Sequence, residues 1–317
     1  MELNPHRLLQ MLSIVPVLGG ARLLALAGRS TRAMGLLGRH LNSPWWKSQS
    51  FAGYVPTAQD VFVATFAKSG TNWMLQITQQ IACLGTAEFD HIHDVVPWPD
   101  APFPEIRAHL NGGSGADCAP TGLRVIKTHF EREYVPFNSQ ARYITVIRDP
   151  KEVVVSSYYF GQAVLDSVGV KYDLETWLAA ARVPQIFLFG DWAAHTAGWW
   201  AVRDRPNVYV VTYGELKRNM VSVIRSIADF LGVALTLEQL ESIVEKSSFA
   251  WMKAHEPRFR PLTLPLRGKK IGPRMMRSGK AGRSAELLSE AQQAVVDRYF
   301  SGRLMQLGSD FPYEEMF

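Results

Sequence analysis

The sequence predicts a single α/β domain in which helices flank a central parallel β-sheet. Three observations support this fold class. Short, nearly continuous apolar runs rich in β-branched residues recur along the chain, as in strands that are buried on both faces. Segments with the apolar spacing of helices separate these runs. The chain has 317 residues, of which 47% are hydrophobic and 20% charged, so it can fill a sizeable core.

Four segments have the composition of buried parallel strands. They are VFVATFA (61–67), LRVIKTH (123–129), RYITVIR (142–148) and NVYVVTY (207–213). Each run is about as long as an ordinary strand. Because parallel strands need crossover connections, we expect helices on both faces of the sheet.

The segments between the strands have helical patterns. Residues 73–84 place their apolar side chains on one face, and Gly85 provides a stop signal for this helix. A second helix is expected to begin after Pro150, and residues 191–203 predict a third. Internal repeats, heptad runs and low-complexity tracts are not recognisable.

The first 45 residues are predicted to form a helical extension that precedes a main domain over residues 46–317. The segment over residues 6–40 is both apolar and basic. Breaks in the apolar run and the lack of a clean cleavage site argue against a secretory signal without excluding one, and the run is too interrupted to span a bilayer. The interrupting residues are Pro16, Gly19, Gly20 and Arg22. Two interpretations stay open, namely two short helices packed on the domain and a basic amphipathic element that rests on a membrane.

The charge balance suits an anionic ligand. Lys and Arg exceed Asp and Glu by 34 to 29, which gives a net charge of +5. A run without acidic residues over 258–283 is consistent with a nucleic-acid surface or with a solvated basic loop. The two cysteines, Cys83 and Cys118, make no disulfide framework, and we expect reduced thiols in a cytoplasmic protein.

Polar residues follow every predicted strand. The first strand leads into Lys68, the second into Lys127 and His129, the third into Arg148, and the fourth into Tyr213. Ligands of open α/β sheets bind outside the carboxyl ends of the strands. Because packing alone does not place cations there, these ends are predicted to form a binding site.

The stretch FAKSGTNWM, which follows the first strand, is predicted to hold an anion. Gly70 permits a tight turn, and N–H groups at the start of the following helix attract negative charge. Lys68 adds a cation, and Trp73 offers a flat face to a base. A Walker A loop needs the pattern G-x-x-x-x-G-K-[ST], but here Lys precedes the glycine and Thr65 occupies the opening position. This departure disfavours hydrolysis of ATP or GTP, and a capped turn without a ligand is the alternative.

Three further features suit the same ligand. Arg148 and Ser156 can reach one phosphate across the junction between the third strand and its helix, unless they only cap that helix. His129 is placed for proton transfer, although a single histidine is often structural. The stretch MRSGKAGRS (276–284) could wrap a phosphate. The sequence shows no ligand spacing typical of a metal site.

Together these motifs resemble the cytosolic-type sulfotransferases that use 3′-phosphoadenosine 5′-phosphosulfate (PAPS). The resemblance runs in order from about residue 60 to residue 283. The matching motifs are FAKSGTNW, RVIKTHF, RYITVIRDPKEVVVSSYYF, GDWAAHTAGWW followed by NVYVVTYGEL, and MRSGKAG. The resemblance implies an α/β fold with a P-loop-like phosphosulfate-binding loop, PAPS as the sulfuryl donor and 3′-phosphoadenosine 5′-phosphate (PAP) as the product, with no metal.

The resemblance also implies roles for individual residues. Those that would hold the 5′ side are Lys68, Ser69, Gly70, Thr71 and Asn72. Those that would bind the 3′-phosphate are Arg148, Ser156, Arg277 and Gly279, next to Ser278. Those that would contact the nucleoside are Trp73, Phe249, Tyr213 and Ser247. The catalytic residues would be His129, as general base, with Lys68 and Lys127.

The chain departs from the family pattern in the late loop. Ser278 replaces a lysine between Arg277 and Gly279, which removes one phosphate-binding cation, and Arg283 with Ser284 replaces Asp-Trp. No dimerisation motif is recognisable, so the oligomeric state stays open.

The predicted reaction transfers a sulfuryl group from PAPS to a hydroxyl of a small, apolar or aromatic acceptor. The acceptor pocket is predicted over residues 94–110 and 160–190, which contain Trp98, Phe103, Phe160, Phe187 and Phe189. A lipid-linked acceptor and a phenol or steroid-like molecule are both open, and nucleic acid is not an expected partner. The alternatives are a non-catalytic adenine-nucleotide-binding or membrane-surface protein on this fold, and a P-loop kinase. The expected location is cytoplasmic or peripheral to a membrane.

Overall fold

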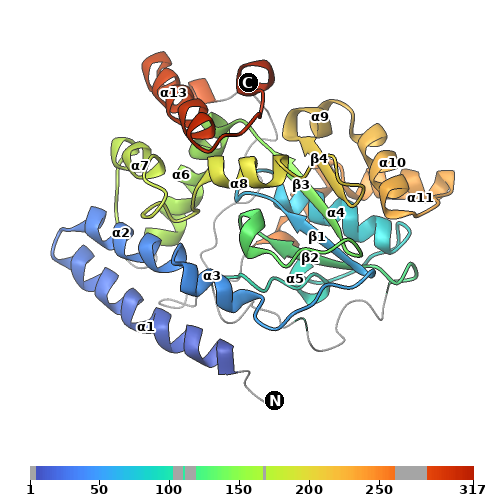
Figure 1. The fold of residues 1–317 in the computed structure, drawn as a ribbon, viewed down its shortest axis with the longest axis horizontal. Coiled ribbons are helices and arrows are strands. Elements are labelled where there is room, and N and C mark those ends of the chain that lie inside the picture. The colour runs from blue at the N-terminus through green and yellow to red at the C-terminus, as the bar shows by residue number, and fades with distance from the viewer. Residues whose placement is uncertain (1–4, 103–109, 111–118, 167–168, 261–283) are drawn as a thin grey trace.

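A computed structural model of the chain describes residues 5–102, 110, 119–166, 169–260 and 284–317, with side chains from residue 12 onward (Figure 1). A parallel sheet lies at its centre. The strands are β1 (Asp60–Ala64), β2 (Arg124–Thr128), β3 (Arg142–Ile147) and β4 (Val208–Thr212). They lie in the order β2-β1-β3-β4, and all neighbours run parallel. The predicted fold class is confirmed, and each predicted strand is present but shorter than the apolar run that predicted it.

The three predicted helices are also present. They are α4 (Thr71–Ala82), α6 (Pro150–Asp166) and α8 (Trp192–Trp200). The other helices are α1 (Pro5–Leu26), α2 (Ser30–Leu41), α3 (Pro44–Ser50), α5 (Ile92–Val95), α7 (Leu174–Ala181), α9 (Tyr213–Arg218), α10 (Met220–Leu231), α11 (Leu237–Lys246), α12 (Phe249–Ala254), α13 (Glu290–Gln306) and α14 (Tyr313–Met316). The described residues also form the short 3₁₀ turns η3 (Arg132–Tyr134), η4 (Glu256–Phe259) and η5 (Ser284–Glu286).

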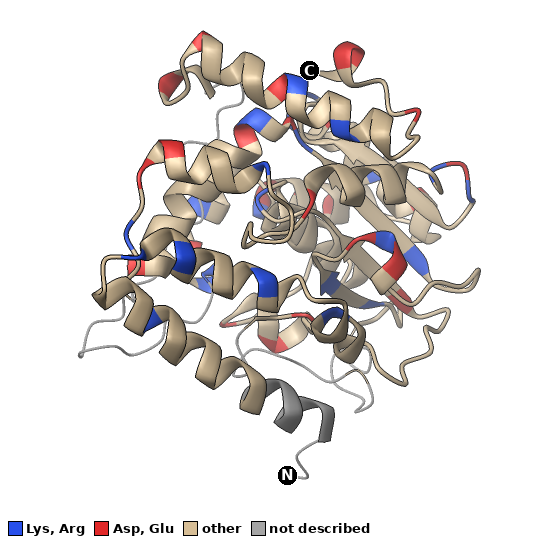
Figure 2. Cartoon of the chain, turned by 60° about the vertical axis from the view of Figure 1, so that its left-hand side comes forward, with Lys and Arg blue, Asp and Glu red and all other residues tan. Residues whose placement is uncertain are grey.

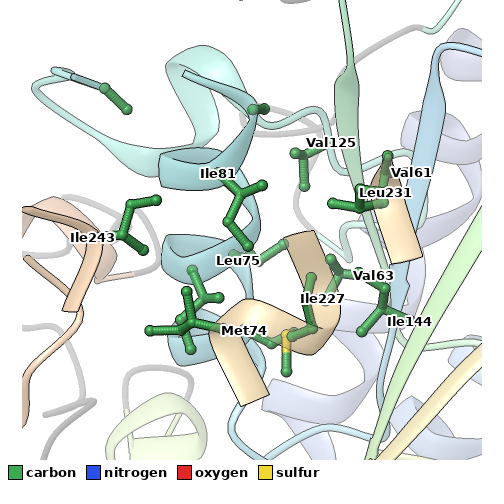
Figure 3. Packing of buried hydrophobic residues seen from close by; sticks show 14 of the residues in the cluster. Val61, Val63, Met74, Leu75, Ile81, Val125, Ile144, Ile227, Leu231 and Ile243 are labelled. Atoms are coloured by element: carbon green, nitrogen blue, oxygen red, sulfur yellow. The ribbon is translucent and has the colours of Figure 1, made fainter. Parts of the chain in front are cut away.

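Alternation along β1 divides the core between the two faces of the sheet. Val61 and Val63 point into a cluster that α4, α10 and α11 cover, as Figure 3 shows. Phe62 and Ala64 point to the other face. Each fully buried side chain of this kind contributes roughly 1.5–3 kcal/mol to folding. The sheet is therefore a rigid platform, and its carboxyl edge can hold polar groups in fixed positions.

Aromatic side chains cover the second face of the sheet. Trp46 of α3 and Trp199 of α8 pack there against Phe62 and Tyr143. Ile14 of α1 joins the same cluster. The N-terminal helices are therefore attached to the domain through its core.

The N-terminal segment forms helices, as one of the two interpretations expected, but α1 is not short. It spans 22 residues and continues through Pro16. Proline removes one backbone donor, and the exposed turn before it allows water to satisfy the freed carbonyl. Gly20 does not end the helix because it lies against α2, where an added Cβ atom would stand 3.2 Å from Leu36. Among the described helices, none combines the length and apolar character needed to cross a bilayer.

Candidate active site

The loop between β1 and α4 has a strained backbone. Lys68 has φ 70° and Gly70 has φ 96°, both in the left-handed region. The Lys68 carbonyl accepts a hydrogen bond from Nη1 of Arg148 at 2.8 Å, and this bond holds the unusual conformation in place. The amide of Ser69 donates to the Phe66 carbonyl at 3.1 Å. The loop therefore curls back, and the first free N–H groups of α4 lie at its end.

Gly70 is required for a second reason. A Cβ atom at this position would lie 2.8 Å from Cδ2 of Tyr213, which follows β4. The Tyr213 ring also lies 4.3 Å from the Arg148 guanidinium carbon. Three strand ends that are distant in sequence therefore meet at one point, as their polar endings predicted.

Hydroxyl groups line the same loop. The Oγ1 atoms of Thr65 and Thr71 are 2.7 Å apart, so these two side chains satisfy each other. Ser69 is fully buried, and its Oγ has no hydrogen-bond partner among the described residues. A buried hydroxyl without a partner is costly, which is consistent with a group kept for a ligand.

Arg148 is held from three sides. Its Nε lies 3.0 Å from a carboxylate oxygen of Glu152, in the first turn of α6. The indole Nε1 of Trp192 donates to the Arg148 carbonyl at 3.1 Å. Sequence analysis missed Glu152 and Trp192, which contact Arg148. The signal was present in the spacing of four residues between Arg148 and Glu152.

Lys68 lies in a desolvated position. Its Nζ is 4.3 Å from the centre of the Phe160 ring. Burial lowers the pKa of Lys68 to about 7, and the positive charge of Arg148 adds to this effect. The Lys68 ammonium lies between an aromatic ring and a second cation, so its charge is poorly balanced. A bound phosphate or sulfate would balance it.

His129 stands at the end of β2 with its tautomer fixed. Its Nδ1 lies 2.8 Å from the Thr65 carbonyl, which can only accept, so Nδ1 carries the proton. Its backbone amide donates to a carboxylate oxygen of Asp100 at 2.8 Å. Burial and the charge of Lys127 hold the pKa of His129 well below its usual range. The ring is therefore neutral at pH 7 and keeps a lone pair on Nε2.

Lys127 lies between two aromatic rings on the same side of the site. Its Nζ is 3.3 Å from the centre of the Trp98 ring and 3.4 Å from Nε2 of His93. His93 donates from Nδ1 to the Val96 carbonyl at 3.0 Å, so its Nε2 accepts from Lys127. Burial lowers the pKa of Lys127 to about 7. Sequence analysis missed His93, whose only sequence signal was its place in the histidine-containing stretch HIHD (91–94).

Two of the residues predicted to contact the nucleoside, Tyr213 and Ser247, lie against Trp73. Its Nε1 donates to the Ser247 carbonyl at 2.8 Å, and its ring meets Tyr213 edge to face at 5.7 Å. The hydroxyl of Ser247 is buried without a partner among the described residues. The side-chain amide of Asn72 donates to the Phe259 carbonyl at 2.9 Å, so it ties α4 to η4.

Some predicted residues are not brought into these contacts. Phe249 is 40% exposed at the start of α12. Ser156 is half-buried in α6, and its hydroxyl makes no hydrogen bond to a described residue. Arg277, Ser278 and Gly279 lie outside the described residues, as do Phe103 and Cys118. Within the described ranges, no group of three or more His, Cys, Asp or Glu side chains is placed to share a metal ion.

The fold and this edge of the sheet define a class of enzyme that transfers a group from an anionic donor nucleotide. The chain matches the sulfotransferase domain family over residues 58–308 and belongs to that family. It is accordingly a PAPS-dependent sulfotransferase. Sulfotransferase 2A1 of Macaca fascicularis is 29% identical over 268 residues, which cover 82% of this chain and 90% of the relative.

Two solved structures share the fold. Mouse sulfotransferase SULT7A1 in complex with PAP has a TM-score of 0.65 at 18% identity, over 88% of this chain and 96% of that one. A retinol dehydratase in complex with androsterone and the inactive cofactor PAP has a TM-score of 0.63 at 19% identity, over 83% and 85%.

Proposed function

We propose that the enzyme transfers the sulfuryl group of PAPS to a hydroxyl of a small apolar or aromatic acceptor, with His129 as the general base. The observation that carries this proposal is the neutral, tautomer-fixed ring of His129 beside Lys127 at the sheet edge where Lys68 lies. The enzyme class itself follows from the family.

In the proposed reaction, Nε2 of His129 takes the proton of the acceptor hydroxyl as its oxygen attacks sulfur. A new bond forms between this oxygen and sulfur while the bond from sulfur to the 5′-phosphate oxygen breaks. The electron pair stays on the phosphate, where Lys68 and the N–H groups at the start of α4 stabilise it. The products are the sulfated acceptor and PAP, and the proton remains on His129 until it is released.

The proposed donor site divides the nucleotide between two sets of residues. The 5′ side would lie on Lys68, Ser69, Gly70, Thr71 and Asn72. The 3′-phosphate would lie at Arg148 and Ser156, with Arg277, Ser278 and Gly279 contributing from outside the described residues. The base would lie near Trp73, Tyr213, Ser247 and Phe249. The hydroxyls of Ser69 and Ser247, which have no partner among the described residues, and the cations at the sheet edge support this division.

Aromatic rings around the reacting groups support an apolar or aromatic acceptor. Trp98 meets the His129 ring edge to face at 5.4 Å. Phe160, beside Lys68, contacts Phe189 at 6.0 Å between ring centres. The retinol dehydratase of similar fold is described with androsterone, a hydroxylated apolar molecule, and a lipid-linked alcohol would offer the same chemistry.

A direct test measures the transfer of labelled sulfate from PAPS to a panel of phenols, steroid alcohols and long-chain alcohols, with and without Mg²⁺. We expect transfer without added metal and highest kcat/KM for apolar acceptors. Turnover of ATP in place of PAPS would support the kinase alternative. Binding of PAP without transfer to any acceptor would support the non-catalytic alternative, and absence of PAP binding would reject the proposal.

A further inference from the structure

Helix α1 presents a row of large apolar side chains to solvent. Leu12, Val15, Leu23 and Leu26 are 63%, 66%, 69% and 78% exposed. At 100° per residue, these four positions fall within an arc of about 80° on one side of the helix. Their spacing therefore makes a continuous stripe and not scattered single residues.

The opposite side of α1 is already covered by the domain. Ile14 and Ala21 are buried there, against the core clusters that also contain Trp46 and Met34. A helix that is apolar all round is normally buried all round. One side of α1 is buried and its other side is equally apolar, so the exposed stripe is a surface for a further contact.

The charge around this stripe is of one sign. Residues 3–59 contain no Asp or Glu, whereas they contain several Lys and Arg. Arg22, Arg29 and Arg32 are exposed at one end of the stripe, and none of them has an ion-pair partner in the described part of the chain. Figure 2 shows blue bands and no red ones along α1 and α2. The partner that fits is apolar at its centre and negative at its surface.

The apolar stripe and the arginines beside it together indicate which partner covers this face of α1. A second copy of the chain, docked stripe to stripe, would offer these arginines no carboxylate from its own residues 3–59. An anionic lipid surface takes the leucines into its acyl boundary and places the arginines among its headgroups. The stripe has this composition, with large aliphatic residues on one face and arginine beside them.

We infer that the exposed face of α1 docks this enzyme on anionic membranes. This inference goes beyond the transfer reaction, and it assigns the N-terminal helices a function of their own. Helix α2, which packs on α1, also contacts the predicted acceptor side. Nδ2 of Asn42, just after α2, donates to the Phe187 carbonyl at 2.6 Å, and Gly38 packs directly on Ile186.

The first experiment is co-sedimentation of the full chain with vesicles. Vesicles of phosphatidylcholine with a quarter phosphatidylserine are compared with vesicles of phosphatidylcholine alone. We expect binding to the anionic vesicles, weaker binding at 0.5 M NaCl, and little binding to the neutral ones, because salt screens exposed charges. Equal binding to both, or binding to neither, would overturn the inference.

The second experiment uses variants of the stripe. Leu23→Glu with Leu26→Glu places two charges in the apolar face, and at least a tenfold loss of vesicle binding is expected. Met305→Glu is the matched control, since Met305 is 73% exposed on α13, and it should bind as the wild type does. PAP binding and near-ultraviolet circular dichroism should stay unchanged in every variant, which separates lost docking from lost folding.

The third experiment reverses the charges. Arg22→Glu, Arg29→Glu and Arg32→Glu are combined, and each reversal is expected to cost roughly fivefold or more in binding to anionic vesicles. Sedimentation velocity of the wild type tests the alternative that α1 joins two copies of the chain. A dimer that the Leu23→Glu, Leu26→Glu variant dissociates, without vesicle binding, would show that α1 joins two copies of the chain and would overturn the membrane assignment.

Discussion

Nδ1 of His129 lies 2.8 Å from the carbonyl oxygen of Thr65, across the gap between two neighbouring strand ends. A carbonyl only accepts, so this contact fixes the proton on Nδ1 and leaves Nε2 as the basic atom. Burial and Lys127 lower the pKa of the ring in the same structure. The backbone just after β1 and the side chain just after β2 together therefore hold His129 as a neutral base before any ligand binds.

Replacement of His129 by alanine should lower kcat by about 10²–10⁴-fold, the usual contribution of a general base, and leave PAP affinity within about twofold. Stopped-time sulfate transfer and calorimetric PAP titration measure the two effects. His40→Ala is a suitable control, because His40 lies in α2 and its ring contacts Trp46. Full activity in His129→Ala would refute the assignment of the base.

The pH dependence of kcat follows from the sign of the same shift. A histidine whose pKa is lowered stays neutral as pH falls through 6.5, the ordinary midpoint. The donor-saturated rate should therefore be flat from about pH 8 to pH 6 and fall only in more acidic buffer. A half-maximal rate near pH 6.5 would show that the base is an ordinary, solvated histidine.

The lysines make a separate prediction about donor binding. The pKa values of Lys68 and Lys127 are both lowered to about 7, so the free enzyme loses positive charge as pH rises through 7. PAP affinity should therefore decline above pH 7. Because the bound phosphates restore the charged forms, binding at pH 8 should take up roughly one to two protons, and binding at pH 6 almost none. Calorimetry in buffers of different ionisation enthalpy measures this uptake, and an equal uptake at both pH values would contradict the shifts.

The sequence predicted the sheet well because its strands are buried on both faces. A nearly continuous, β-branched apolar run such as VFVATFA is typical of a strand that is buried on both faces. The strand ends were equally informative, since polar residues interrupt these runs at Lys68, Lys127 and Arg148. Parallel pairing then brings those ends to one edge, which the registers of β1, β2 and β3 confirm.

What the sequence did not predict depends on contacts between distant segments. His93 contacts Lys127 from a four-residue helix, and no local sequence pattern predicts that contact. The length of α1 was misjudged because Pro16 and Gly20 are helix breakers in isolation. Packing of α1 on α2 outweighs those local preferences.

Gly70→Ala should damage both folding and donor binding. The left-handed φ of 96° costs an alanine about 1 kcal/mol, and the clash with Tyr213 at 2.8 Å adds roughly 1–3 kcal/mol. Gly53→Ala is the matched control, because Gly53 has φ 73° and nothing within 4 Å of an added Cβ atom. Urea unfolding should show a larger loss of stability in Gly70→Ala than in Gly53→Ala. PAP titration should show a loss of affinity of about tenfold or more only in Gly70→Ala. Equal losses in the two variants would remove Tyr213 from the explanation.

Arg148→Lys should weaken PAP binding by roughly 10–100-fold, although the charge is kept. Lysine has one side-chain nitrogen, which cannot replace both the Nη1 that donates to the Lys68 carbonyl and the Nε that pairs with Glu152, and it lacks the planar fork that suits a phosphate. Arg142→Lys serves as the control at the opposite end of β3, where Arg142 donates to the Ala58 carbonyl in an exposed position. Unchanged PAP affinity in Arg148→Lys would show that the guanidinium supports the loop without contacting the donor.

His93 is expected to act as a positioning residue for Lys127. Its Nε2, 3.4 Å from the Lys127 Nζ, draws the ammonium over the Trp98 ring, which is 3.3 Å away. His93→Ala should release the ammonium and lower kcat by about tenfold, with little change in PAP affinity. His93→Gln should recover most of the rate, because an amide can donate to the Val96 carbonyl and accept from Lys127 in place of the imidazole. A purely structural role predicts instead that thermal stability and kcat fall together in both variants, so comparing the two melting temperatures with the two rates decides between these roles.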